Sequence, residues 1–341
     1  MNPKKLLVWL GHPFFSRYLD ELGWGCVYAP YSREKLYTWK NILELTNGSK
    51  PDAVVVADAS SPPFALNTES YPCVTVFYSV DSHIHSWHPA YAQGFDIVLA
   101  THKEHMPLFC IGRLADWQVW WTPPHTRDND RPPVPPPAKE WELVFAGTVN
   151  EERAPERYHF LRELKERFPS LHVTADRFSQ VYPKAKLVLN ESSRGELNFR
   201  VFEALGYGAC LLTPDIGAEL DELFVPGQEL FVYPPLNVDA LVALARRLLA
   251  DTPLRERTAS AGLAAVDARH RTSIRAKEFS EKLHSLFASG KAGELVAQRL
   301  NHHSNVPYEA LRLLYLHHAE TVGLEPQRRQ YLEAALRLRH W

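Results

Sequence analysis

The stretch from Gly195 to Asp215 reads Gly-Glu-Leu-Asn-Phe-Arg-Val-Phe-Glu-Ala-Leu-Gly-Tyr-Gly-Ala-Cys-Leu-Leu-Thr-Pro-Asp. Helical spacing of its apolar residues predicts a short amphipathic helix over 198–207, with a buried side. That side contains Phe199, Phe202 and Leu205. An apolar run at 209–212 follows and predicts a buried strand. The stretch therefore indicates one helix–strand unit of a layered α/β domain.

Three polar residues lie near the start of this predicted helix, namely Asn198, Arg200 and Glu203. A helix N-terminus with a nearby arginine suits an anion such as a phosphate. A carboxylate one turn further on suits the paired hydroxyls of a ribose. This combination predicts a site for a nucleotide-linked ligand.

The bulk composition is that of an ordinary globular protein. The chain has 341 residues, enough for two domains, with 45% hydrophobic and 23% charged residues. A net charge of −2 argues against general nucleic-acid binding. The four cysteines form no Cys-x-x-Cys pair, and we expect thiols in a reducing compartment. With no signal peptide or membrane span expected, the sequence predicts a cytoplasmic protein.

Strand and helix patterns alternate along the first third of the chain, which predicts a parallel sheet covered on both faces. Strands are expected at 5–10, 54–57, 73–78 and 97–100, and helices at 14–22, 33–46 and 102–109. The pattern restarts at Glu142, with strands expected at 143–146, 172–174, 187–189, 209–212 and 230–233. Helices are expected there at 152–167, 198–207, 236–250, 253–267 and 270–287.

A proline-rich stretch between the two patterns is the best domain boundary, because it suits neither a helix nor a central strand. We expect an N-terminal Rossmann-like domain at 1–125, a linker at 126–141, a C-terminal Rossmann-like domain at 142–290 and a helical tail at 291–341. The tail has helical patterns at 307–321 and 326–339. Three roles are open for the tail: packing on the first domain, supporting a surface that binds an acceptor substrate, or forming a homodimer contact.

Several blocks of the sequence resemble GT-B glycosyltransferases, most closely the group related to the spore-maturation protein CgeB. The first block is Arg-Val-Phe-Glu-Ala-Leu-Gly-Tyr-Gly at 200–208, which resembles their donor-site signature. The other blocks are Phe145 to Arg153, Glu229 to Tyr233, and His270 to Ala276. The resemblance covers roughly residues 80–290. It implies two Rossmann-like domains facing across a cleft, and metal-independent transfer of a hexose from a nucleotide-diphosphate sugar.

The resemblance also implies roles for residues of the second domain. Glu203 would bind the ribose. Gly147, Thr148 and Arg153 would lie near the phosphates, as would Asn190, Arg194, Asn198 and Arg200. The alternative is that these residues bind no ligand. The segment at Gly147 is then a tight turn with a solvated arginine, and the later segment is a capped helix whose arginines face solvent.

The glutamate spacing departs from the family. Many retaining members have seven residues between two glutamates, whereas six residues separate Glu196 from Glu203. The position where the family has its first glutamate is Gly195 in this sequence. A separation of seven positions on a helix still keeps both carboxylates within about 20° of each other. Glu196 is therefore kept as a ligand-binding candidate, and retention is expected.

A polar and aromatic cluster follows the strand at 73–78, in the run Tyr-Ser-Val-Asp-Ser-His-Ile-His-Ser-Trp-His-Pro at 78–89. Asp81, His83 and His85 are the candidate catalytic residues, since the family often places a first-domain histidine against the donor sugar. Two alternatives are a His-x-His-x-x-His metal site and histidines held by loop hydrogen bonds.

Three hypotheses for the whole protein follow. The favoured one is a glycosyltransferase that needs no cofactor, uses a UDP-type donor, and modifies a glycan, a protein or a small molecule. The second is a nucleotide-sugar epimerase, which would change the sugar without an acceptor. The third is a binding protein that kept the fold without catalysis.

Overall fold

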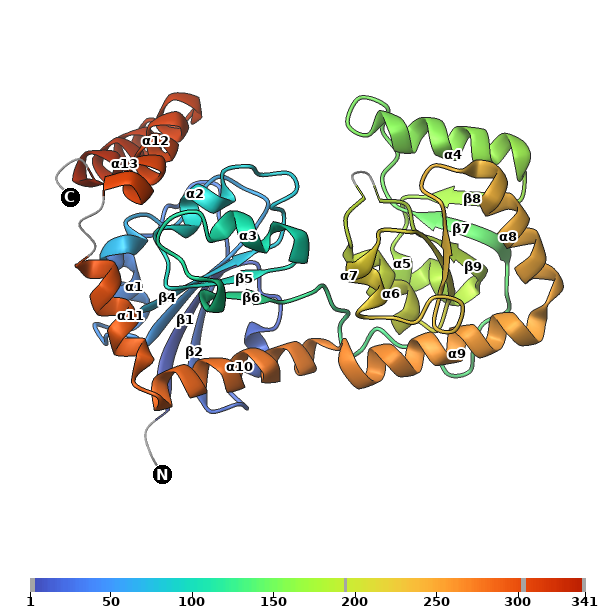
Figure 1. The fold of residues 1–341 in the computed structure, drawn as a ribbon, viewed down its shortest axis with the longest axis horizontal. Coiled ribbons are helices and arrows are strands. Elements are labelled where there is room, and N and C mark those ends of the chain that lie inside the picture. Colours follow the sequence, from blue (N-terminus) through green and yellow to red (C-terminus); the bar gives the residue numbers. More distant parts are fainter. Residues whose placement is uncertain (1–3, 193–194, 302–304, 339–341) are drawn as a thin grey trace. The chain divides into compact units, whose positions relative to one another are not determined.

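The computed structural model describes residues 4–192, 195–301 and 305–338. The chain forms two compact units (Figure 1). The first consists of residues 1–123 together with 275–341, and the second of residues 124–274. Both are α/β units built on a parallel sheet, as the sequence predicts.

The first sheet has six strands in the order β2-β1-β3-β4-β5-β6, and all its pairings are parallel. The strands are β1 Lys5–Gly11, β2 Trp24–Ala29, β3 Ala53–Ala57, β4 Val74–Ser79, β5 Ile97–Ala100 and β6 Val119–Trp121. Every residue of β3 and β4 is buried. Continuous apolar runs of this kind are typical of parallel strands with helices on both faces.

The second sheet has five parallel strands in the order β11-β10-β9-β7-β8. They are β7 Trp141–Ala146, β8 Leu171–Thr174, β9 Ala185–Leu189, β10 Cys210–Pro214 and β11 Phe231–Tyr233. One face of this sheet packs on α4 (Pro155–Arg167) and α8 (Val238–Ala250). The helices α5 Phe178–Val181, α6 Phe199–Gly206, α7 Ala218–Asp221 and α9 Thr252–Arg269 complete the unit.

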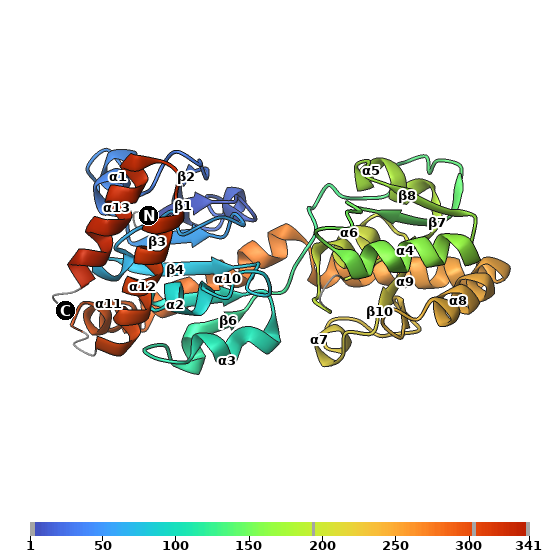
Figure 2. The same ribbon diagram turned by 90° about the horizontal axis from the view of Figure 1, so that it is seen from above.

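Helices from both ends of the chain cover the first sheet. They are α1 Trp39–Leu45, α2 His88–Ala92, α3 Met106–Phe109, α10 Thr272–Ala288, α11 Lys291–Leu300, α12 Asn305–Thr321 and α13 Glu325–Arg337. Alternate residues along β1 point to opposite faces. Val8 and Leu10 join α12 and α13 in one core, whereas Leu7 and Trp9 join α10 and α11 in the other. Figure 2 shows both groups of helices around the sheet.

The elements differ from the sequence predictions at several places. The predicted helix at 14–22 is wrong, because the structure has only a single 3₁₀ turn at Ser16–Tyr18. Strands β2 and β6 and helix α11 were not predicted. Residues 275–290 lie in the first unit rather than in the second domain, since α10 places Phe279 and Leu283 under the first sheet.

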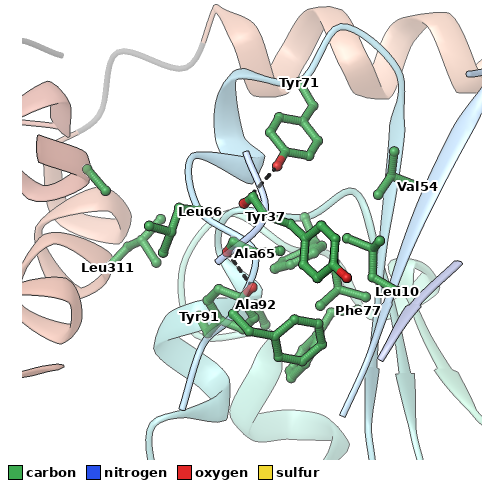
Figure 3. Close-up of a cluster of buried hydrophobic side chains, with 14 of the residues drawn as sticks. Leu10, Tyr37, Val54, Ala65, Leu66, Tyr71, Phe77, Tyr91, Ala92 and Leu311 are labelled. Carbon is green, nitrogen blue, oxygen red and sulfur yellow. Dashed lines mark hydrogen bonds between the residues drawn. The ribbon is translucent and has the colours of Figure 1, made fainter. Parts of the chain in front are cut away.

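The C-terminal tail is an integral part of the first unit. Leu311 of α12 is buried and lies beside Leu66 in the core of the first sheet (Figure 3). In the same region the Tyr91 hydroxyl donates to the carbonyl oxygen of Ala65 at 2.6 Å. The tail therefore packs on the first domain, one of the three roles expected for it.

A buried ion pair fixes α11 to the sheet. Arg299 Nε lies 2.9 Å from Asp96 Oδ1, and both side chains are fully buried. The guanidinium also donates to four backbone carbonyl oxygens, those of Thr68, Glu69, Tyr71 and Cys73. All five donors of an arginine are thereby used, which is what makes a buried charge tolerable.

Arg299→Met should therefore destabilise the protein strongly. It leaves the Asp96 carboxylate unpaired in the core, a loss of about 3–5 kcal/mol in the free energy of unfolding. Urea unfolding followed by tryptophan fluorescence measures it. The matched control is Arg328→Met, which breaks only an exposed pair with Glu325 and should change little. Equal effects of the two substitutions would contradict this account of the tail.

Candidate functional site

A pocket of about 380 Å³ lies in the second unit, at the edge of the sheet where β7 ends. In open α/β sheets this carboxyl edge is where ligands bind. Twelve residues line the pocket: Ala146, Gly147, Arg157, Asp176, Arg177, Phe178, Tyr182, Glu196, Asn198, Phe199, Arg200 and Glu203. Five of the candidates from the sequence are thus brought together here, namely Gly147, Glu196, Asn198, Arg200 and Glu203.

Helix α6 brings several of these residues to the pocket. Its apolar side buries Val201, Phe202 and Leu205, which fixes the opposite side toward the pocket. The residue before the helix, Asn198, has extended backbone (φ −112°, ψ 165°), so the helix begins at the pocket wall. No donor from the described residues reaches the buried Asn198 Oδ1. The start of α6 thus lines the pocket through Asn198, Phe199 and Arg200.

Arg200 connects three parts of the pocket. Its Nε donates to the carbonyl oxygen of Ala146 at 3.1 Å, at the end of β7. Its Nη1 donates to Asn190 Oδ1 at 2.8 Å and to the carbonyl oxygen of Glu191 at 3.0 Å, just after β9. Asn190 is itself buried and donates to Thr213 Oγ1. Asn190 thus lies behind Arg200 and orients it, rather than lining the pocket.

Gly147 leaves room for the close approach of this arginine. A Cβ at this position would lie 3.0 Å from Arg200 Nη2 and 3.1 Å from Phe145 Cζ, closer than most such contacts allow. The Gly147 amide donates to the carbonyl oxygen of Thr174. The glycine therefore lets the Arg200 guanidinium lie against the loop that follows β7.

Glu203 is a carboxylate held in an unfavourable environment. Burial raises its pKa to about 7, against an ordinary value of 4.5. Arg200 and Arg127 oppose this rise in the pKa, while Asp130 adds to it. A buried carboxylate with a perturbed pKa at a pocket wall is a frequent mark of a functional group.

The other predicted residues of this unit lie elsewhere. Thr148 and Arg153 are exposed on the segment between β7 and α4, outside the pocket lining. Glu196 lines the pocket and accepts a hydrogen bond from Ser192 Oγ at 2.6 Å. Arg194 lies outside the described residues.

Sequence reasoning missed a second arginine in this pocket. Arg157, in the first turn of α4, pairs with the buried Glu191 through its Nε. Burial raises the pKa of Glu191, and the hydrogen bond from Arg157 opposes that rise. The signal for Arg157 was its place four residues after the candidate Arg153, in the helix predicted at 152–167.

Tyr182 and Phe178 were also missed. They come from the segment after β8, and their rings lie 5.7 Å apart at the pocket wall. Only the fold brings this segment beside α6.

In the first unit, a polar cluster gathers where β3 and β4 end. Asp58 follows β3 and accepts hydrogen bonds from the backbone amides of Ser60 and Asp81, both at 2.8 Å. The position of the candidate Asp81 is therefore fixed by a buried carboxylate that sequence reasoning missed. The signal for Asp58 was its place directly after a buried strand.

The histidines of this cluster differ in their surroundings. His88 is fully buried, and its Nδ1 lies 2.8 Å from Ser79 Oγ. Burial lowers the pKa of His88 to about 3, so its ring is neutral at physiological pH. The candidates His83 and His85 are only partly buried. The His83 ring packs edge-on against His102, and His85 lies 5.4 Å from His88.

The described part of the chain has neither a cluster of metal-ligand side chains nor a membrane-spanning helix. No group of three histidine, cysteine, aspartate or glutamate side chains is arranged to hold a metal ion there. None of the described helices is long and apolar enough to cross a membrane.

Comparisons with known proteins agree with this architecture. Residues 139–281 match the family model described as glycosyl transferase-like. A glycosyltransferase from Rickettsia africae superimposes with a TM-score of 0.63 at 11% identity, covering 84% of this chain and 99% of that one. Sucrose-phosphate synthase from Thermosynechococcus elongatus gives 0.58 at 12% identity, covering 84% and 100%. HepE from Anabaena, in complex with UDP and glucose, gives 0.56 at 12% identity, covering 83% and 100%.

No curated protein sequence matches the chain. The fold is nevertheless that of the GT-B glycosyltransferases, as expected from the sequence. The segment that matches the glycosyl transferase-like model, residues 139–281, contains all the residues that line the 380 Å³ pocket.

Glu203→Gln should stabilise the ligand-free protein at high pH. Because burial raises the Glu203 pKa, the folded state binds more protons than the unfolded state between about pH 4.5 and 7, and stability is lost as the pH rises. The substitution should raise the melting temperature at pH 8 and have little effect at pH 5. The gain is at most about 3.5 kcal/mol, since one pKa unit corresponds to about 1.4 kcal/mol.

Melting curves of both proteins at the two pH values test this prediction. Glu256→Gln, an exposed glutamate of α9, controls for the loss of one surface charge. A Glu203→Gln protein that melts lower than the wild type at pH 8 would contradict it.

Proposed function

We propose that this protein transfers a hexose from a nucleotide-diphosphate sugar to an acceptor, without a metal and with retention at the anomeric carbon. The observation that carries the proposal is the pocket at the start of α6, where Arg200 and Glu203 line one wall. A cation and a helix N-terminus suit the diphosphate, and the carboxylate suits the ribose.

In the proposed complex, the Glu203 carboxylate accepts hydrogen bonds from the ribose hydroxyls. Arg200 and the amides of the first turn of α6 face the diphosphate, with Asn198 and Glu196 beside them. Gly147, Thr148 and Arg153 of the loop after β7 would contact the outer phosphate. Arg157 adds a second cation to the pocket, although Glu191 partly neutralises it.

A UDP-type donor is the best-supported choice. HepE, which shares the fold, was solved with UDP and glucose. The Phe178 and Tyr182 rings provide flat apolar surfaces in the same pocket, which suit a planar base. We therefore propose UDP as the nucleotide part of the donor.

Rate acceleration would come from stabilising the leaving diphosphate. Negative charge grows on it as the sugar acquires oxocarbenium character. Arg200 is held in place by its three hydrogen bonds, so little reorganisation would be needed when that charge develops. Asp81, His83 and His85 of the first unit would act on the sugar and the acceptor.

We also propose that the enzyme works in the cytoplasm. The four cysteines are free thiols, which favours the cytoplasm. The closer likeness to the CgeB-related group and a homodimer through the tail stay predictions.

Product analysis separates the three hypotheses for the function, because an epimerase releases a changed nucleotide sugar without any acceptor and a binding protein turns over no donor.

A nucleotide screen tests donor binding. UDP should raise the melting temperature more than GDP, ADP, CMP or dTDP if it is the nucleotide of the donor. A ligand at 100 times its Kd stabilises the native state by about 2.7 kcal/mol. Glu203→Ala should lose most of this shift, whereas the exposed-site control Glu256→Ala should keep it. No shift with any nucleotide would overturn the proposed donor site.

Substitutions in the first unit should separate catalysis from donor binding. Asp81→Asn, His83→Ala and His85→Ala should each slow sugar release from the donor, by about 10²–10⁴-fold where the side chain moves a proton. UDP affinity should stay unchanged, because its pocket lies in the other unit. His159→Ala, exposed on α4, serves as the control. Full turnover in all three variants would remove these residues from the mechanism.

A further inference from the structure

The first unit contains a second pocket, of about 340 Å³, that the donor site does not use. The segments after β2 and β3 form one side of it, and helices α12 and α13 form the other. The lining residues are Tyr31, Ser32, Arg33, Leu36, Pro62, Phe64, His318, Thr321, Val322, Leu324, Gln327 and Tyr331. The tail, outside the segment matched by the family model, thus supplies half of the wall.

Two hydrogen bonds hold the tail at this position. The Tyr331 hydroxyl donates to the carbonyl oxygen of Pro63 at 2.6 Å, and Gln327 Nε2 donates to the carbonyl oxygen of Arg33 at 2.5 Å. Both side chains are buried. The pocket is therefore a fixed feature of the docked tail.

Aromatic rings form much of the wall. Tyr31 packs edge-on against Phe64 with ring centroids 5.2 Å apart, and His318 lies 5.7 Å from Tyr331. His318 is 7% exposed, and within the described residues its Nε2 has no hydrogen-bond partner. Burial lowers the pKa of His318 to about 4, so its ring is neutral at physiological pH. A neutral imidazole can exchange a hydrogen bond with a hydroxyl group.

The charge of the wall argues against an anionic ligand. Among the lining residues, all of which the structure describes, Arg33 carries the one full charge, and it is exposed at the rim. A phosphate or carboxylate in the interior would face a neutral histidine and apolar rings. The wall instead suits a neutral ligand with both apolar faces and hydroxyl groups.

We propose that this pocket binds one neutral hexose unit of the acceptor. A sugar ring places its C–H face on aromatic side chains and its hydroxyls on polar groups, and the wall offers both. The volume lies at the small end of the roughly 300–1,000 Å³ that small-molecule sites occupy, as a single sugar requires. The acceptor would accordingly be a glycan or glycoside, an inference that rests on the proposed function.

The pocket adjoins the candidate catalytic cluster of the same unit. Trp87 lies between them, with its ring 5.9 Å from His318 and 5.6 Å from His85. Both sites lie at the carboxyl edge of the first sheet, because Ser32 follows β2 and Pro62 follows β3. A sugar in the pocket would therefore reach the side of the cluster that carries His85.

Saturation-transfer difference NMR on the full chain tests the proposal directly. The probes are the methyl glycosides of glucose, galactose, mannose and N-acetylglucosamine, with UDP present to occupy the donor pocket. At least one glycoside should receive saturation on its ring protons. A panel without any transfer overturns the inference, whatever the donor experiments show.

Two variants locate the binding within the protein. Thr321→Trp fills the pocket, whereas Glu320→Trp adds the same ring at the neighbouring exposed position and serves as the matched control. The signal should disappear in the first variant and persist in the second. Equal signals in both would place the sugar elsewhere and overturn the inference.

His318→Phe keeps an aromatic ring but removes the unpartnered nitrogen. The variant should melt at or above the wild-type temperature and lose at least tenfold in glycoside affinity. Unchanged affinity would exclude His318 as a sugar contact and contradict the proposed wall chemistry. UDP binding, measured on the same samples, should be retained throughout, so a failed acceptor pocket is distinguishable from a failed donor site.

Discussion

The candidate donor site depends on the hydrogen bonds of one guanidinium. Arg200, in the first turn of α6, joins the end of β7, 54 positions earlier in the sequence, to the residues that follow β9. Because Gly147 has no side chain, the loop after β7 can lie against this group. The shape of the pocket follows from these contacts, and so does the place of Glu203 one turn further along α6.

Without a ligand, the same arrangement leaves two polar groups in unfavourable surroundings. Glu203 sits where burial penalises its ionised form, and Asn198 Oδ1 finds no donor in the described part of the chain. Groups placed against their own solvation preferences are typical of sites built for a ligand. By contrast, Arg299 in the first unit uses all five donors and serves only the docking of the tail.

Helices and strands with a clear local repeat of apolar residues can be predicted from the sequence. The helix expected at 198–207 is α6, Phe199–Gly206, because its apolar residues repeat at helical spacing over a buried face. Strand β2 was missed because Gly25 interrupts a half-exposed run, and β6 because it has only three residues and two prolines follow after Thr122.

The candidate site was only partly predictable for a different reason. Glu203 and Arg200 carry a local signal, as polar residues at the start of an amphipathic helix. That Gly147 packs against Arg200, or that Tyr182 joins the same pocket, depends on contacts between distant segments. The sequence of the tail did not indicate this pocket, since His318 and Tyr331 line it together with Phe64 only after α12 and α13 have docked.

The central claim is that the Glu203 carboxylate recognises the ribose of the donor. Isothermal titration calorimetry of UDP and of 2′,3′-dideoxy-UDP, on the wild type and on Glu203→Ala, tests it most directly. The account predicts that removing the two hydroxyls weakens binding to the wild type and makes little difference to the variant. An equal loss in both proteins would show that Glu203 does not contact the ribose, and would contradict the account.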